Sequence, residues 1–114
     1  MKIHFMNLHN NPFEKIKEGK KTVEIRLFDD KRKELNIGDE IVFNNRETNE
    51  KIKVEITEIK IFKSFEELYK NYDKIAMGYN QNEKANPEDM EIYYTKEEQE
   101  KFGVCGIEIK LKEK

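Results

Sequence analysis

The sequence predicts an α+β fold, a small β-barrel of about five to six strands with short helices inserted at its ends. Two observations support this prediction. Short runs with apolar residues at every second position recur along the chain, and helix start and stop signals lie between them. The 114 residues are enough for one domain, residues 1–114, and too few for two domains of ordinary size.

The first two elements are a strand and a short helix. Met1 to Leu8 alternates loosely between apolar and polar residues, which is typical of a strand buried on at least one side. Asn11 and Pro12 predict the helix start, because asparagine is a favoured N-cap and proline is favoured at the first helical position. Gly19 predicts the helix end, since glycine readily takes the positive φ that terminates helices.

The next strand is predicted from Thr22 to Phe28, and its alternation divides it into two faces. The apolar face carries Val23, Ile25 and Leu27, and the polar face carries Thr22, Glu24 and Arg26. The pattern therefore indicates a strand with one apolar side and one charged side.

Three further strands are expected at Glu40–Phe43, Lys51–Phe62 and Val104–Leu111. Within the long central one, the apolar residues change phase part-way along the run. Because the side-chain period of a strand is two, this change predicts a bulge or bend near Thr57 and Glu58. A strand that changes face is typical of small barrels.

Three helices are expected in the second half of the chain. Ser64 to Glu67 has the spacing of a capping box and predicts the start of the longest helix, with apolar residues continuing at helical intervals to Tyr72. Asn86-Pro87 and Thr95 predict the starts of two short helices, and Gly103 predicts the end of the second.

The charge distribution argues against binding to duplex DNA. The net charge is −2, whereas proteins that hold duplex DNA by bulk electrostatics are usually strongly basic. The charges are unevenly placed, however. Residues 14–33 carry eight basic and five acidic side chains, and residues 83–100 carry two basic and seven acidic ones. The chain is therefore polarised, with its basic part at residues 14–33.

Few residues suit a metal site or a thiol-based active site. Cys105 is the only cysteine and lies in an apolar run, so buried packing is expected of it. His4 and His9 fall on opposite faces of the first strand without a further partner, so neither a metal site nor a cofactor is predicted. No stretch resembles a signal peptide or a membrane span, and we expect a cytoplasmic protein with no membrane partner.

One short run combines a glycine with several charged residues. Gly19-Lys20-Lys21-Thr22-Val23-Glu24-Ile25-Arg26 fits the pattern G-x-K-x-x-E-x-R. This pattern resembles the signature of ASCH domains, the family named for homology to the activating signal cointegrator, whose barrel is similar to the PUA domain. Pro12–Ile16, Ile37–Asp39 and Phe102–Ile107 also resemble the family, so the similarity covers nearly the whole chain.

The resemblance implies a cleft beside the barrel with Lys21, Glu24 and Arg26 along one wall, and it implies RNA or a modified nucleoside as the ligand. Gly19 has a structural role in the motif. The residue chemistry is suitable, because arginine offers a planar fork of donors, lysine a mobile charge, and glutamate an acceptor for an exocyclic amine or for the arginine. Without the resemblance, the alternative is a solvated strand face with ordinary surface ion pairs.

Further side chains could contact such a ligand. Lys20 lies within the motif, and Lys31 and Arg32 follow it in a charged loop, where they would contact RNA phosphates or remain solvated. The aromatic candidates for stacking on a base are Tyr94, Tyr79 and Tyr93, with core packing expected for at least two of them.

An enzymatic alternative also follows from the resemblance. Some small bacterial ASCH proteins are amidohydrolases that remove the acetyl group from N4-acetylcytidine with a lysine, a threonine and a glutamate. Lys21 matches that lysine, while Glu24 stands at the threonine position and Thr22 lies beside the lysine. If the chain is an enzyme, Lys21 and Glu24 are its catalytic candidates. The family's glutamate has three candidate counterparts, namely Glu83, Glu88 and Glu91.

Overall fold

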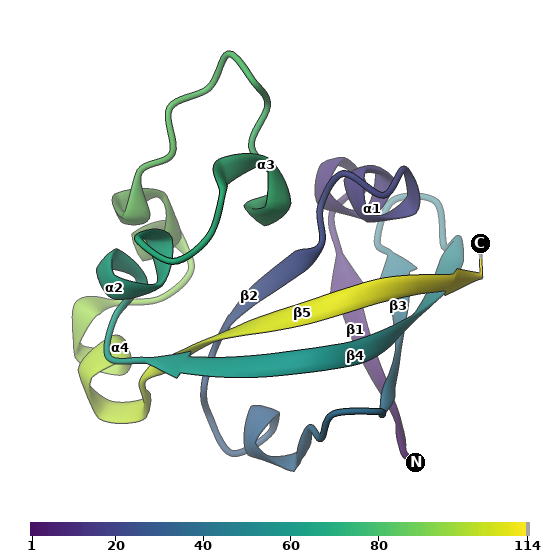
Figure 1. Cartoon of the computed structure of the whole chain (residues 1–114), viewed down its shortest axis with the longest axis horizontal. Coiled ribbons are helices and arrows are strands. Elements are labelled where there is room, and N and C mark those ends of the chain that lie inside the picture. The colour runs from purple at the N-terminus through teal and green to yellow at the C-terminus, as the bar shows by residue number, and fades with distance from the viewer. Residues whose placement is uncertain (114) are drawn as a thin grey trace.

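A computed structural model describes residues 1–113 and shows a curled five-stranded sheet with short helices at its ends (Figure 1). The strands are β1 (Ile3–Leu8), β2 (Val23–Leu27), β3 (Glu40–Asn45), β4 (Lys51–Phe62) and β5 (Val104–Glu113). The helices are α1 (Asn10–Lys17), α2 (Phe65–Tyr69), α3 (Lys74–Met77) and α4 (Lys96–Phe102), with 3₁₀ turns η1 (Arg32–Glu34) and η2 (Pro87–Ile92). The predicted α+β, barrel-like fold is confirmed.

The sheet is mixed, and its two edge strands are β1 and β2. The strand order is β1-β3-β4-β5-β2, in which β1 runs parallel to β3 and all other neighbours are antiparallel. Because the sheet curls, the two edges approach each other, and Arg26 Nη2 of β2 donates a hydrogen bond to Asn7 O of β1 at 3.2 Å. The result is a half-barrel with an opening between β1 and β2.

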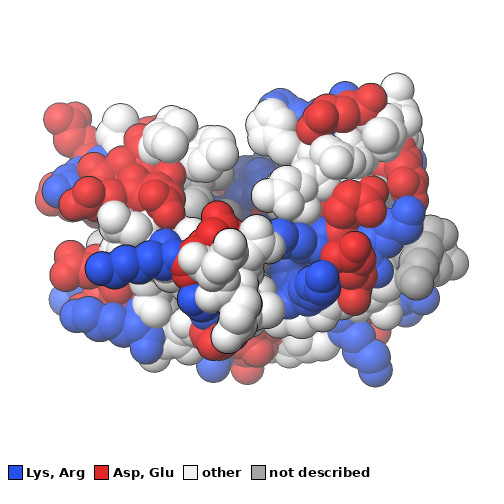
Figure 2. All heavy atoms as spheres, turned by 90° about the horizontal axis from the view of Figure 1, so that it is seen from above, with Lys and Arg blue, Asp and Glu red and all other residues white. Residues whose placement is uncertain are grey.

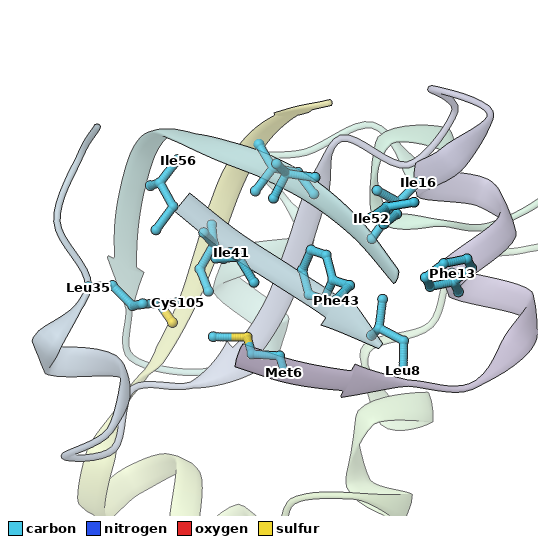
Figure 3. Packing of buried hydrophobic residues seen from close by; sticks show 13 residues of the cluster. Met6, Leu8, Phe13, Ile16, Leu35, Ile41, Phe43, Ile52, Ile56 and Cys105 are labelled. Carbon is cyan, nitrogen blue, oxygen red and sulfur yellow. The ribbon is translucent and has the colours of Figure 1, made fainter. Parts of the chain in front are cut away.

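The inside of the curl holds the larger hydrophobic core (Figure 3). Phe13 and Ile16 from α1 pack there with side chains of β1, β3 and β4, including the fully buried Phe43. Each such side chain stabilises the fold by about 1.5–3 kcal/mol relative to exposure. Helix α1 is therefore fixed to the sheet beside the end of β1.

A second core lies on the other side of β2. Val23, Ile25 and Leu27 pack there with Phe65 and Leu68 from α2 and with further residues of α3 and β5. The predicted alternation of β2 is thus confirmed, with its apolar face toward the small helices. Its charged face turns toward the opening beside β1, and Glu24 is only 3% exposed. The alternative of a solvated charged face is therefore wrong for Glu24.

Several local predictions hold in detail. The pairing of β4 with β5 shifts register between Ile56 and Glu58, where the bulge is predicted. Gly19 follows α1 with φ of +80°, and Gly103 follows α4 with φ of +74°. Cys105 is completely buried, and burial raises the pKa of its thiol to about 12.

Helix lengths differ from the predictions. Helix α1 begins at Asn10 with His9 as N-cap, so Pro12 lies third in the first turn, where its missing N–H still costs no hydrogen bond. Helix α2 spans five residues and is not the longest, since α1 spans eight. The chain leaves α2 before Tyr72, whose ring lies so close to Gly106 that a Cβ there would be 2.6 Å from a ring carbon. Tertiary packing thus overrides the helical spacing.

The N-cap of α4 provides a direct test of local helix stability. Thr95 accepts a hydrogen bond from Glu98 N, and the Glu98 side chain accepts one from Thr95 N, which completes a capping box. We expect Thr95→Ala to lower the free energy of unfolding by about 1 kcal/mol. Urea denaturation measures this loss, and Thr95→Ser, which keeps the hydroxyl, should retain most of the stability. Equal losses in both variants would contradict the capping explanation.

Candidate ligand-binding site

A cavity of about 480 Å³ opens where the two edges of the sheet meet. Its walls come from the end of β1, the start of α1, strand β2, the turn between β3 and β4, and parts of the segment from residue 77 to residue 94. Figure 2, seen from above, shows a hollow near the middle with basic side chains in it and acidic side chains on both sides of it. The volume is in the range of pockets for small organic ligands.

One wall consists of a triad of charged side chains, Lys21, Glu24 and Arg26, of which Glu24 is buried and the other two are mostly buried. Lys21 Nζ lies 3.0 Å from Glu24 Oε1, and Arg26 Nε and Nη2 each lie 2.8 Å from Glu24 Oε2. Both carboxylate oxygens are therefore engaged by cations. The second hydrogen bond of Arg26, to Asn7 O, fixes the guanidinium against β1. The triad is thus preorganised, with donors of Lys21 and Arg26 directed along one wall.

The chain reaches Lys21 through a tight turn at Gly19. After Gly19, the N–H groups of Lys20 and Lys21 both donate to Lys15 O, at 2.9 and 3.1 Å. On the other side, Gly78 packs on the Lys21 side chain, since a Cβ at Gly78 would lie 3.1 Å from Lys21 Cδ, and its φ is +108°. Glycine at these two positions therefore lets Lys21 lie between the ends of α1 and α3.

The electrostatics of the triad keep Glu24 ionised. Burial alone would raise the pKa of Glu24, but the adjacent Lys21 and Arg26 outweigh it and lower the pKa from 4.5 to about 2. Burial alone would likewise lower the pKa of Arg26, and Glu24 reverses that effect, so the pKa of Arg26 is raised. At neutral pH the Glu24 carboxylate is therefore a fixed anion between two cations.

This lowered pKa predicts an acid-dependent loss of stability. Because the pKa of Glu24 is lower in the folded state than in the unfolded state, its contribution is fully present above about pH 5 and disappears as the pH falls toward about 2. A shift of this size corresponds to about 3 kcal/mol. Urea denaturation of wild type and Glu24→Gln across this pH range measures it. The stability difference between the two proteins should shrink as the pH falls, and a constant difference would contradict the prediction.

The facing wall is rich in tyrosine. Tyr79 donates a hydrogen bond to Asp89 Oδ2 at 2.7 Å, and its hydroxyl lies 2.9 Å from that of Tyr69. Tyr94 stacks on Phe65 with ring centroids 5.7 Å apart, and the next residue, Tyr93, is 62% exposed and also lines the cavity. Tyr79 and Tyr94 also pack against the second core, as expected for two of the three tyrosine candidates.

The cavity brings together some of the predicted site residues and leaves others outside. Lys21, Glu24, Arg26 and Tyr94 line it, whereas Lys20, Lys31 and Arg32 do not. Lys20 is exposed beside Glu18, Lys31 is exposed next to η1, and Arg32 is directed toward Asp29 at 3.5 Å. Of the three candidate glutamates, Glu83 lines the cavity and Glu88 and Glu91 do not.

Sequence reasoning missed several cavity residues. Asn7 and His9, at the end of β1, and Arg46, in the turn between β3 and β4, line the cavity together. Arg46 lies in a polar segment for which the sequence predicts only a connecting turn. No local pattern distinguishes it from other surface arginines. Only the tertiary structure brings this turn to the same cavity as β2. Within residues 1–113, no three His, Cys, Asp or Glu side chains gather in a way that could hold a metal ion.

The relationship to known proteins agrees with this geometry. The sequence profile of the ASCH domain family matches residues 6–113. The chain belongs to the ASCH domain family. This ASCH domain has the PUA-like fold of its family, with the G-x-K-x-x-E-x-R residues of the motif at residues 19–26. In the part of the chain that the structure describes, no helix has the length and apolar character needed to cross a membrane.

Two solved structures are similar to this ASCH domain over almost its whole length. The crystal structure of hypothetical protein PH0355 is 31% identical, with a TM-score of 0.81, and the match covers 98% of this chain and 100% of that chain. The solution NMR structure of protein PF0455 from Pyrococcus furiosus is also 31% identical, with a TM-score of 0.70 and 96% of each chain covered. No curated protein matches the sequence.

Proposed function

We propose that this ASCH domain binds RNA or a modified nucleoside in the cavity beside β2. The observation that carries this proposal is the buried triad: Lys21 and Arg26 share one carboxylate, so the wall holds an excess positive charge inside a cavity of nucleoside size. Burying such charges is costly and adds little stability compared with apolar packing. A ligand-binding role gives a reason for the cost.

The chemistry of the two walls suits a nucleobase. Lys21 and Arg26 are donors, so they would face acceptors such as base carbonyl oxygens or phosphate oxygens. Aromatic side chains stack on unpaired bases, and the exposed ring of Tyr93 and the partly buried ring of Tyr94 border the same cavity. Lys31 is exposed outside the cavity and would contact only an RNA that extends beyond it, whereas the Arg32 side chain is only 12% exposed beside Asp29.

Titration with labelled single-stranded RNA and with nucleosides tests this function. Arg26→Lys keeps the charge but loses the planar fork, and we expect it to weaken binding by about tenfold or more. The matched control is Lys20→Ala, which removes an exposed lysine of the same motif outside the cavity. Unchanged affinity in Arg26→Lys, with the fold intact by circular dichroism, would show that the cavity is not the binding site.

Hydrolysis of an acylated nucleoside is the second candidate. It is favoured by one observation, that Lys21 and Glu83 line the same cavity. Two contacts count against it: Glu24 occupies the position of the hydrolases' threonine and is locked between cations, and Glu83 Oε1 accepts a hydrogen bond from Asn80 N at 2.6 Å. We therefore place hydrolysis second to binding.

Incubation with N4-acetylcytidine separates the two candidates. Under pure binding, no acetate is released by wild type, Lys21→Ala or Lys20→Ala. Turnover by the wild type that Lys21→Ala abolishes and Lys20→Ala preserves would instead assign hydrolysis to the cavity. Chromatographic separation of cytidine from N4-acetylcytidine measures either result.

A further inference from the structure

Arg46 differs from the other cations of the cavity because no carboxylate neutralises it. Lys21 and Arg26 share Glu24, as described above. The Arg46 side chain lines the same cavity but forms no ion pair and no side-chain hydrogen bond within the described part of the chain. Its full positive charge is therefore available to a ligand.

The turn that carries Arg46 is held firmly in place. Arg46 N donates to Leu8 O at 2.8 Å. The preceding residue, Asn45, is completely buried, donates to Asn10 Oδ1 at 2.9 Å and accepts a hydrogen bond from Glu47 N at 2.9 Å. The nearest carboxylate in the sequence, Glu47, is engaged by Asn10 N at 2.7 Å. The backbone of Arg46 is thus fixed, while its guanidinium remains free of partners among residues 1–113.

The end of β1 lies between Arg46 and Arg26. Asn7 O accepts a hydrogen bond from Arg26 Nη2, and the next carbonyl, Leu8 O, accepts one from Arg46 N. Successive carbonyls of a strand point to opposite sides, so the two arginines approach β1 from opposite sides. The guanidinium of Arg26 and the backbone of Arg46 therefore bond to neighbouring residues of β1. One ligand in the cavity could contact both.

The charges of the cavity are also polarised. The side formed by β2 and the β3–β4 turn carries the triad, with its excess positive charge, and the unpaired Arg46. The side formed by residues 77–94 contributes the carboxylates of Glu83 and Asp89. Such a field favours a ligand with an anionic group at the Arg46 end and hydrogen-bond donors at the other.

We propose that Arg46 forms a phosphate subsite, so that the cavity prefers a phosphorylated nucleoside to an uncharged one. This inference rests on the proposed function and specifies the chemical class of its ligand as a phosphorylated nucleoside. The phosphate is either that of a free nucleotide or that of one nucleotide within RNA. Arginine suits this role because its fork of donors binds two phosphate oxygens at once. Arg46 is thus a specificity-determining residue, while the triad and Tyr94 hold the nucleoside.

The test compares wild type, Arg46→Gln and Lys51→Gln with three kinds of ligand. Lys51→Gln is the matched control, since it removes one charge at the start of β4, close to the same turn in the sequence and outside the cavity. The ligands are the four ribonucleosides, their 3′- and 5′-monophosphates, and a single-stranded RNA hexamer. Inorganic phosphate alone serves as the control for nonspecific anion binding. Calorimetry gives the affinities, and urea denaturation checks that each variant folds.

We expect nucleotides to bind at least about tenfold more tightly than nucleosides, and Arg46→Gln to remove that difference without changing nucleoside affinity. For the RNA, Arg46→Gln should reduce the salt dependence of binding by about one phosphate contact. Preference for RNA over monophosphates identifies RNA as the source of the phosphate, and the reverse preference identifies a free nucleotide.

Four results would overturn the inference. If nucleosides and nucleotides bind equally, the phosphate subsite is wrong while the proposed function stands. Equal effects of Arg46→Gln and Lys51→Gln would reduce Arg46 to a general surface charge, and displacement of nucleotides by equimolar inorganic phosphate would have the same consequence. If neither nucleosides, nucleotides nor RNA bind, the proposed function itself fails, and this inference fails with it.

Discussion

Replacing Glu24 with alanine is expected to lower the free energy of unfolding by about 3 kcal/mol, at the lower end of the range for breaking a buried ion pair. The substitution leaves Lys21 and Arg26, with side chains only 10% and 17% exposed, without their shared carboxylate. The cost should not reach the upper end of the range, because both cations line an open cavity and can gain water there. Urea denaturation at neutral pH measures the change.

The control for this prediction is Glu18→Ala. Glu18 also pairs with a lysine of the motif, Lys20, but its side chain is 52% exposed, and such pairs contribute little. We expect Glu18→Ala to change the stability by less than about 0.5 kcal/mol. A loss below about 1 kcal/mol in Glu24→Ala would mean that the triad is not an interdependent buried unit.

Replacing the whole triad with apolar residues should preserve the stability of the fold but abolish ligand binding. In Lys21→Met, Glu24→Leu, Arg26→Met, no buried charge is left without a partner. Apolar replacements of buried ion pairs are often neutral or stabilising, so we expect unfolding free energy within about 1 kcal/mol of wild type. Ligand binding should be lost, because every charged donor and acceptor of this wall is removed.

This triple variant therefore separates stability from function. In urea denaturation, the free energy of unfolding of the triple variant should exceed that of Glu24→Ala by about 2–3 kcal/mol. RNA and nucleoside titrations should show no binding in the cavity. If the triple variant is as unstable as Glu24→Ala, the loss in the single variant comes from packing and not from unpaired charge. If it binds as well as wild type, the triad is not part of the binding site.

Much of the fold follows from local chemistry in the sequence. The alternation in β2, the bulge in β4, and the glycines after α1 and α4 each reflect a rule that acts over a few residues, namely the strand period of two and the tolerance of glycine for positive φ. The G-x-K-x-x-E-x-R motif is likewise contiguous, so three of its charged residues could be placed on or beside one strand from the sequence alone.

The length of α2 and the boundaries of α1 were not predictable in the same way. The spacing of Leu68, Tyr69 and Tyr72 fits one continuous helix, but the chain leaves helical geometry and places the Tyr72 ring against Gly106, 34 positions later. The hydroxyl of Tyr72 also donates to Glu108 Oε2 at 3.0 Å. Such long-range contacts decide where a short helix ends, because its own propensity is weak.

By itself, the sequence determined the fold class, the family resemblance and the two faces of β2. Only the tertiary structure decided what each face of β2 contacts. The apolar face packs on the small helices, and the curl of the sheet encloses the charged face beside β1. The tertiary structure likewise brings Arg46, Glu83 and Asp89 to one cavity from distant segments. The physical reason is that burial and cavity walls depend on contacts between strands and turns that are far apart in the sequence. The periodicity of a single segment carries no information about those contacts.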